Sequence, residues 1–123
     1  MKFTTKEIGN IGETYTVKYL KKHGYKILER NYLKRYGEID IVAENKEYLV
    51  FVEVKTRNIN TLVRGGEAVN YHKRQCLIKT ALAYLSEHKV DKFCRFDVSE
   101  VYVYRDTLKL QSINYIENAF SPE

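Results

Sequence analysis

Two acidic side chains and a lysine interrupt an otherwise apolar part of the chain, residues 37–57 (GEIDIVAENKEYLVFVEVKTR). Asp40 lies in the first apolar run, and Glu53 and Lys55 lie in the second. Neighbouring carboxylates resist joint ionisation unless a cation lies between them. Mg²⁺ or Mn²⁺ suits such a position, because these ions take oxygen ligands, keep several waters and also bind phosphate. We therefore interpret the three residues as a candidate site for metal-assisted hydrolysis of phosphodiester bonds.

The spacing within the second apolar run places Glu53 and Lys55 on one face. Side chains of a strand alternate with a period of two, so these residues are about 7 Å apart along the strand. The valines of the same run face the opposite way, into a core (Val50, Val52 and Val54). If the two runs pair through a short turn, Asp40 comes alongside Glu53 where the strands separate. Lys55 could then balance the carboxylates, orient a water molecule or stabilise charge that develops on the phosphate.

A simpler interpretation makes these three charges an ion-pair cluster on a solvated sheet face. Exposed ion pairs are common and contribute little to stability, and a Glu-x-Lys pattern recurs by chance. The combination nevertheless favours a site, because an acidic residue precedes the pattern by a hairpin-sized gap and the second run is otherwise apolar.

Helix and strand patterns on both sides of this segment predict the elements that position it. Residues 5–25 have apolar side chains at helical spacing, with Thr5 as a cap and Gly24 as a stop. Residues 70–89 form a second helical pattern. Strand patterns cover residues 25–33, 37–44, 48–56 and 92–104, and residues 107–120 suggest only a short strand followed by a frayed tail. The order predicts one α/β domain over residues 1–123, with a mixed β-sheet of about four to five strands flanked by helices.

The first helical segment contains two glycines and an acidic residue at the flank of its apolar stripe. Gly9 and Gly12 each cost a helix about 1 kcal/mol relative to alanine. We expect close packing of this helix against a sheet to explain both glycines. Glu13 lies one and two turns before Val17 and Leu20, so it lies beside the packed face and not on the opposite, wet face.

Composition and charge restrict the setting in which the protein works. The chain has 123 residues, of which 44% are hydrophobic and 30% are charged, which suits one domain with its own core. The net charge of +5 favours an anionic partner such as nucleic acid. No apolar run approaches the roughly 18 residues of a membrane span, and the N-terminus lacks the apolar core of a signal peptide. Cys76 and Cys94 suit free thiols, so we expect a cytoplasmic protein with no membrane partner.

A family resemblance covers most of the chain. The signature GEIDIVA…LVFVEVKTR resembles the active-site pattern of the restriction-endonuclease-like superfamily, Asp…(Asp/Glu)-x-Lys. More narrowly, residues 11–57 resemble the YraN family of bacterial endonuclease-like proteins, and the resemblance continues through AVNYHKRQCLIKTALAYL and RFDVSEV. That family is in turn similar to archaeal Holliday-junction resolvases. The resemblance implies a restriction-endonuclease-like core and a metal-dependent endonuclease that hydrolyses DNA, including branched or structured DNA, and that could act as a homodimer.

The resemblance also implies a role for each candidate residue. Asp40, Glu53 and Glu13 would be ligands of Mg²⁺ or Mn²⁺, and the backbone carbonyl of Val54 would be a further ligand. Lys55 would be the catalytic lysine. Ile39 stands where many members of the superfamily have proline, although this departure looks normal for the narrower family.

Basic residues after the central strands are candidates for nucleic-acid binding. Arg57 and Arg64 belong to a polar, glycine-containing loop that could close over a phosphate backbone. Lys73 and Arg74 open the second helix if Asn70 is its N-cap. Cations at that end of a helix are unfavourable unless they bind an anion such as phosphate.

Three further observations concern the surroundings of the candidate site. The second helix could instead start near Glu67, which would make its early charges ordinary solvated residues. Gln75 on the same helix could reach the site, as a polar residue does in some related nucleases. Tyr32, Tyr36 and Arg35 could stack on unpaired bases, although most of the 11 tyrosines are better explained as core or rim residues.

Two functions other than an active nuclease are compatible with these patterns. One is a nucleic-acid-binding module that retains a nuclease fold without turnover. The other is a protein-interaction domain whose acidic cluster is an ion-pair network. Cleavage that depends on Asp40 and Lys55 would distinguish the enzyme from both.

Overall fold

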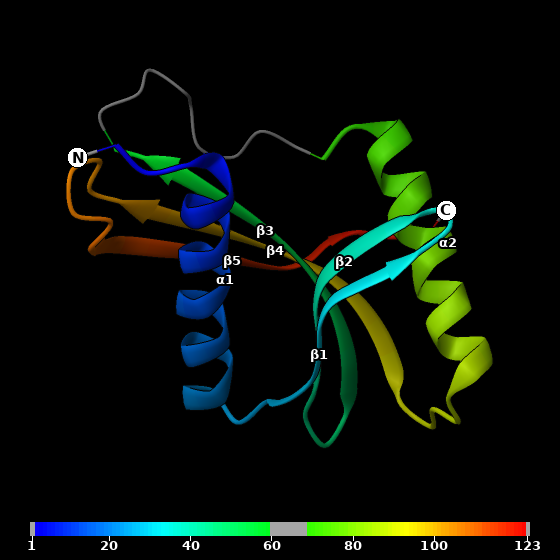
Figure 1. The fold of residues 1–123 in the computed structure, drawn as a ribbon. Coiled ribbons are helices and arrows are strands. Elements are labelled where there is room, and N and C mark those ends of the chain that lie inside the picture. Colours follow the sequence, from blue (N-terminus) through cyan, green and yellow to red (C-terminus); the bar gives the residue numbers. More distant parts are fainter. Residues whose placement is uncertain (1, 60–68, 123) are drawn as a thin grey trace.

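The described residues form seven elements in the order that the sequence predicts. The structure is a computed structural model that describes residues 2–59 and 69–122. In chain order the elements are α1 (Thr5–Lys22), β1 (Lys26–Lys34), β2 (Gly37–Glu44), β3 (Tyr48–Asn58), α2 (Tyr71–Glu87), β4 (Phe93–Val103) and β5 (Leu110–Phe120). The predicted α/β class is confirmed, and the arrangement is that of a restriction-endonuclease-like core (Figure 1).

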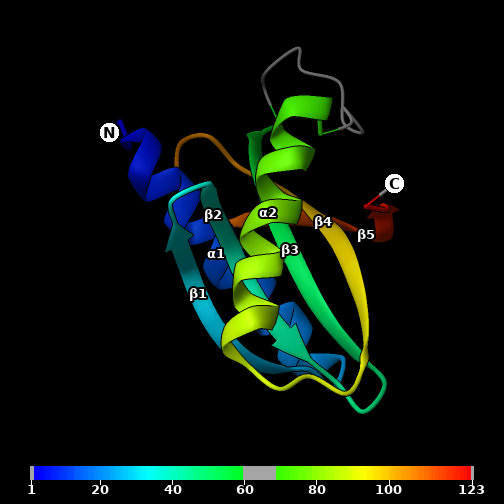
Figure 2. The same ribbon diagram turned by 90° about the vertical axis from the view of Figure 1, so that its right-hand side faces the viewer.

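The strands form one mixed sheet in the order β1-β2-β3-β4-β5. β3 and β4 are parallel, and every other neighbouring pair is antiparallel. Parallel neighbours need a crossover connection, and α2 lies within it. Figure 2 shows α2 in front of the sheet and α1 behind it.

Both faces of the central strands are buried, each under one helix. On the α1 side, Val50 and Val52 pack with Leu20 in one core cluster. On the α2 side, Phe51 packs with Tyr84 in another. The expected alternation of β3 is confirmed for its valines, and its opposite face is apolar up to Phe51 before it becomes charged.

The start of α1 differs by one residue from the predicted start. Thr4, not Thr5, is the N-cap, because Thr4 forms a reciprocal capping box with Glu7 three residues later. Gly24 has φ +87° and follows the C-cap of the helix, in agreement with its predicted role as a stop.

Close packing explains only one of the two helix glycines. A Cβ atom on Gly12 would lie 1.8 Å from Oγ1 of Thr56 on β3, so only glycine allows α1 to approach the sheet at this point. A Cβ atom on Gly9 would meet nothing within 4 Å, so the packing explanation is wrong for that residue.

The C-terminal segment is more regular than its sequence suggests. In place of a short strand and a frayed tail, β5 runs for 11 residues and pairs along β4 from Val103 to Phe96. The weak pattern of this segment arises because much of an edge strand is exposed, while Ile116 and Phe120 still pack against the core. Within the described residues, no helix is long and apolar enough to cross a membrane.

Candidate active site

Asp40 occupies the point where β2 and β3 separate. The register of this antiparallel pair ends at Ile41 opposite Val52, so Asp40 and Glu53 are the next two residues beyond the paired ladder. There the Asp40 carboxylate accepts a 2.8 Å hydrogen bond from the backbone N–H of Val54. The Asp40 side chain thus accepts a hydrogen bond from the β3 backbone at a point where the β2 backbone no longer supplies a carbonyl. The carboxylate lies between the diverging strands as a result.

The first turn of α2 reaches Glu53 through Lys73. Asn70 is the N-cap, and its side chain accepts a 2.8 Å hydrogen bond from the backbone N–H of Lys73. The helix therefore begins at Tyr71, which agrees with the first of the two predicted starts. Nζ of Lys73 lies 3.3 Å from Oε1 of Glu53. The lysine predicted to contact phosphate thus pairs with a candidate metal ligand.

Glu13 approaches from the other helix. It directly follows Gly12, whose close contact with β3 brings this part of α1 onto the sheet. Glu13 is 8% exposed, and its Oε1 lies 3.6 Å from a guanidinium nitrogen of Arg30 on β1. Asn31, the next residue of β1, has φ 53° and also interacts with the Glu13 side chain.

Arg30 and Asn31 were not predicted as part of the site. A signal for them exists in the sequence, because asparagine is disfavoured inside strands and tolerates positive φ better than most residues. That signal indicates an irregular strand, but it does not indicate which side chain Asn31 contacts.

Burial makes all three carboxyl groups resist ionisation. Burial raises the pKa of Asp40 to about 7, and the Glu53 carboxylate adds to the rise, while the hydrogen bond from Val54 opposes it. The pKa of Glu53 is also raised, mainly by burial and against the opposing charge of Lys73. The pKa of Glu13 is raised by burial as well. A cation among these groups would favour their charged forms.

Unpartnered buried oxygens test whether the site suits a metal ion. Oε2 of Glu53 is buried and has no hydrogen-bond partner, and Oε1 of Glu13 is buried with only the 3.6 Å ion pair to Arg30. A buried polar atom without a partner costs free energy, and a cation would remove that cost. The donors are all oxygens, which suits Mg²⁺ or Mn²⁺. The chemistry of the residues therefore fits such an ion.

The three carboxylates do not form a ready-made ligand group. Within residues 2–59 and 69–122, no three His, Cys, Asp or Glu side chains are grouped closely enough to hold a metal ion. Asp40 and Glu53 interact directly with one another, whereas Glu13 is engaged on the β1 side. Binding would therefore need rotation of side chains, with the Val54 carbonyl and water as further ligands.

Lys55 lies beyond Glu53 on β3 and beside a buried acid on β4. Its positive charge lowers the pKa of the Glu53 carboxyl, against the larger effect of burial. In the parallel register Lys55 is opposite Glu100, which is fully buried and accepts a 2.8 Å hydrogen bond from Asn114. The burial of Glu100 beside Lys55 was not predicted from the sequence, because the pattern of a single acid in an alternating strand indicates a solvent-facing residue.

The other predicted nucleic-acid contacts lie at different places. Arg74 lies over the ring of Tyr71, with Cζ 6.0 Å from the ring centroid. Gln75 is half-buried on α2, and Arg57 is half-buried near the end of β3. Arg64 lies outside the described residues.

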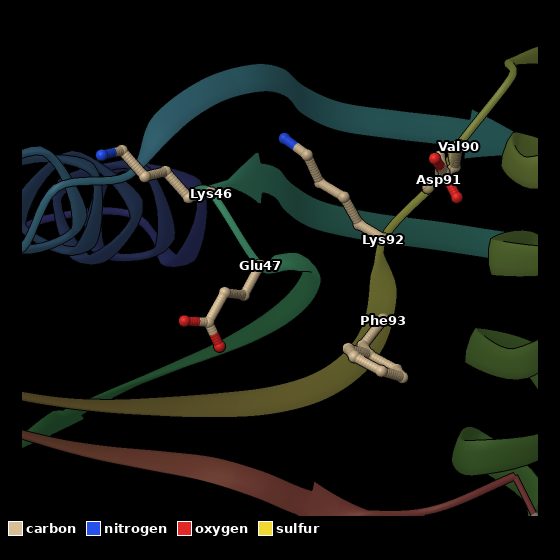
Figure 3. Close-up of a pocket in the computed structure, with 6 residues that line it drawn as sticks. All are labelled: Lys46, Glu47, Val90, Asp91, Lys92 and Phe93. Atoms are coloured by element: carbon tan, nitrogen blue, oxygen red, sulfur yellow. The ribbon is translucent and has the colours of Figure 1, made fainter.

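A surface hollow at the other end of the sheet is separate from these carboxylates. It lies between the β2–β3 turn and the start of β4 (Figure 3), and its lining residues are Lys46, Glu47, Val90, Asp91, Lys92 and Phe93. Because β3 begins at that turn and Glu53 lies further along the strand, the hollow does not contain the candidate site.

The sequence matches one family along most of its length. The model of the uncharacterised protein family UPF0102 matches residues 12–101. The UPF0102 protein of Caldanaerobacter subterraneus subsp. tengcongensis is 42% identical over 120 residues, which cover 97% of this chain and 98% of the relative. The UPF0102 protein of Alkaliphilus oremlandii is 45% identical over 118 residues, covering 94% and 98%. A similar protein of Clostridium botulinum is 42% identical over 123 residues, covering 98% of each chain.

Proposed function

The chain belongs to the UPF0102 family, which is the family that the sequence resemblance identified as YraN, and we propose that it is a metal-dependent endonuclease that hydrolyses DNA phosphodiester bonds. Branched or structured DNA is included in the proposed substrates. The observation that carries the proposal is the meeting of Asp40 and Glu53 where β2 and β3 separate, with a buried, unpartnered oxygen on Glu53.

Mg²⁺ or Mn²⁺ would be held by Asp40, Glu53 and the Val54 carbonyl, with Glu13 completing the set from α1. When bound, such an ion polarises a phosphate oxygen and lowers the pKa of water. The hydrogen bond from the Val54 N–H orients the Asp40 carboxylate toward the gap between the strands. That orientation holds the carboxylate in place before any ligand arrives.

Two lysines supply positive charge at the same place. Lys55 follows Glu53 on the same strand face and can orient the attacking water or stabilise charge on the phosphate. Lys73 pairs with Glu53 and remains half exposed, so its ammonium can turn toward an entering phosphate. Lys73 would then exchange the Glu53 carboxylate for a substrate phosphate. That exchange would couple entry of the substrate to the ionisation of Glu53.

A second candidate function follows from the incomplete ligand group. Since the described carboxylates do not converge as a three-residue cluster, a nucleic-acid-binding module with a retained but non-catalytic nuclease fold is the alternative. The two functions differ in turnover and not in binding.

A cleavage panel tests the proposal. Labelled single strands, duplexes, flaps and four-way junctions are incubated with the full chain and either Mg²⁺ or Mn²⁺. We expect cleavage that falls at least about 100-fold in Asp40→Ala and in Lys55→Ala, because each removes charge that acts on the transition state. Glu47→Ala is the matched control, since Glu47 is an exposed acid in the β2–β3 turn.

Binding measurements separate the two candidate functions. Protein that binds branched DNA but cuts no substrate with either metal would be the binding module. Protein that binds no nucleic acid at about 50 mM salt, where electrostatic binding is strong, would contradict both. Titration of Mg²⁺ by calorimetry supplies a readout that does not depend on activity, and Asp40→Ala should weaken that binding.

A further inference from the structure

The turn between β1 and β2 presents an aromatic ring with two cations near it. Tyr36 is 48% exposed. Cζ of Arg35 lies 5.8 Å from the centroid of its ring, and Nζ of Lys79 on α2 lies 5.6 Å from it. The turn is supported by α2, because a Cβ atom on Gly37 would lie 3.5 Å from the Cβ atom of Cys76. Tyr36 is therefore an exposed ring on a supported hairpin.

The start of α2 presents a second exposed ring with a cation beside it. Tyr71 is 67% exposed, and Cζ of Arg74 lies 6.0 Å from the centroid of its ring. Within the described residues, no carboxylate forms an ion pair with the cations beside the two rings, which are Arg35, Arg74 and Lys79. Their charge is therefore available to an anion outside the chain.

Helix α2 places both rings, because Tyr71 opens the helix and Tyr36 lies against Lys79 on the same helix. Lys73, which reaches Glu53, lies two residues after Tyr71 on the helix. Lys79, which contacts Tyr36, lies eight residues beyond Tyr71, or roughly 12 Å along the axis at the helical rise. That span corresponds to about three to four nucleotides at the roughly 3.4 Å spacing of one strand. A strand that lies along α2 could thus meet both rings.

Tyr32, which the sequence also suggested as a stacking residue, has Nζ of Lys34 5.2 Å from its ring centroid, but Lys34 is paired with Glu87. Its hydroxyl donates a hydrogen bond to Glu87, and its ring packs edge-on against Tyr84. It is half-buried and contributes to the core on the α2 side. The ring is therefore a structural element and not a free stacking face.

We propose that Tyr36 and Tyr71 are base-stacking residues that make the proposed nuclease prefer nucleic acid with unpaired bases. The inference rests on the proposed function and deepens it. An aromatic face stacks with any base, and the neighbouring cations attract the phosphates of the same strand. In a duplex the bases stack on one another, so their faces are not free for the tyrosines. The occupant of this surface is an unpaired strand.

The test measures binding and not cleavage. Fluorescence anisotropy of the full chain is recorded in EDTA, with a labelled single strand of about 12 nucleotides and a blunt duplex of the same sequence. We expect Tyr36→Ala and Tyr71→Ala each to weaken single-strand binding about tenfold and to change duplex binding less than twofold. Tyr36→Phe and Tyr71→Phe keep the aromatic face and should bind as the wild type does.

A control and a spectroscopic readout exclude a merely structural effect. Phe93→Ala removes a more exposed ring, 73% exposed, beside a lysine at the far end of the sheet, and should leave binding unchanged. A 2-aminopurine base in the single strand should be quenched on binding to the wild type. The quenching should diminish in Tyr36→Ala or Tyr71→Ala at saturating protein.

The outcomes distinguish failure of this inference from failure of the proposed function. Equal single-strand binding by the wild type and the two alanine variants would overturn the stacking role and leave the nuclease proposal standing. An equal loss of duplex and single-strand binding would also overturn it, because it would show a purely electrostatic surface. Loss of self-association in place of DNA binding would assign the rings to a protein contact. Absence of any nucleic-acid binding by the wild type would overturn both proposals.

Discussion

At the scale of single residues, Asp40 combines two properties that oppose each other. Its carboxylate accepts a hydrogen bond from the Val54 N–H, which favours the charged form. Burial and the neighbouring Glu53 carboxylate outweigh that bond and raise the pKa of Asp40 to about 7. A buried acid near a second acid is unfavourable for folding, and sites that carry function often contain such groups.

The stability of the folded chain should therefore depend on the ionisation of Asp40. The pKa of Asp40 is raised from 3.8 to about 7 in the folded state, so its stabilising contribution is complete below about pH 4 and is lost as the pH rises through 7. The loss is at most about 4 kcal/mol. Asp40→Asn keeps an oxygen that can accept from Val54 and cannot ionise.

Urea denaturation of the wild type and Asp40→Asn between pH 4 and pH 8 measures this effect. We expect the stability of Asp40→Asn relative to the wild type to increase across that range. Millimolar Mg²⁺ should reduce the difference at pH 8 if the ion binds the charged carboxylate. Parallel stability curves for the two proteins would show that the carboxyl group ionises normally.

At the scale of elements, each helix brings one charged group to the sheet. α1 carries Glu13 next to its closest contact with β3, and α2 carries Lys73 in its first turn. The separation of β2 and β3 provides the gap that these groups approach. The site therefore depends on how closely the two helices pack.

Substitution of Gly12 tests the contact between α1 and β3. We expect Gly12→Ala to destabilise the fold by about 1–3 kcal/mol, because the new methyl group overlaps Thr56. Gly9→Ala is the matched control and should stabilise the helix by up to about 1 kcal/mol, since nothing lies within 4 Å of its Cβ position. Thermal unfolding of both variants checks the prediction, and a stable Gly12→Ala protein would contradict it.

The N-cap of α2 offers a second test at this scale. Asn70→Ala should cost about 1 kcal/mol, because the hydrogen bond to the Lys73 N–H is lost. Asn70→Asp should be at least as stable as the wild type, since the first turn contains no acidic residue and the helix dipole favours a negative charge there. Denaturant titration at pH 7 compares the three proteins, and an unchanged midpoint in Asn70→Ala would exclude the cap.

At the scale of the whole molecule, a buried polar network joins distant parts of the chain. Asp97 on β4 is fully buried and forms two hydrogen bonds with the guanidinium of Arg95, at 2.8 and 2.9 Å. It also accepts hydrogen bonds from the Tyr115 hydroxyl and the Asn118 N–H on β5. Arg95 in turn donates to the hydroxyl of Tyr25, which follows α1. The network thus connects the C-terminal strand to the N-terminal half of the fold.

Removal of the central acid should destabilise the whole fold. Asp97→Ala removes the closest acidic partner of the buried Arg95 guanidinium and leaves only the 3.8 Å ion pair with Glu117, so we expect a loss of about 3–5 kcal/mol. Asp91→Ala removes an exposed acid just before β4 and should change stability by less than about 0.5 kcal/mol. Urea denaturation measures both variants. A loss below about 1 kcal/mol in Asp97→Ala would show that the network contributes little.

Local patterns in the sequence were sufficient for several parts of the fold and the candidate site. Alternation in residues 48–56 predicted which face Glu53 shares with Lys55, because side-chain direction in a strand depends only on position. Asn70 and Gly24 marked helix ends through backbone geometry that each residue type favours. The quoted signature also indicated the family correctly.

Other features were decided only by tertiary structure. Lys73 pairs with Glu53, Arg30 approaches Glu13, and Glu100 is buried beside Lys55. Gly9 and Gly12 are alike in sequence context, yet only Gly12 contacts the sheet. These relations depend on how closely helices and strands that are far apart in the chain approach one another. Spacing along the chain determines the direction of a side chain, whereas its partners are determined by packing across the whole molecule.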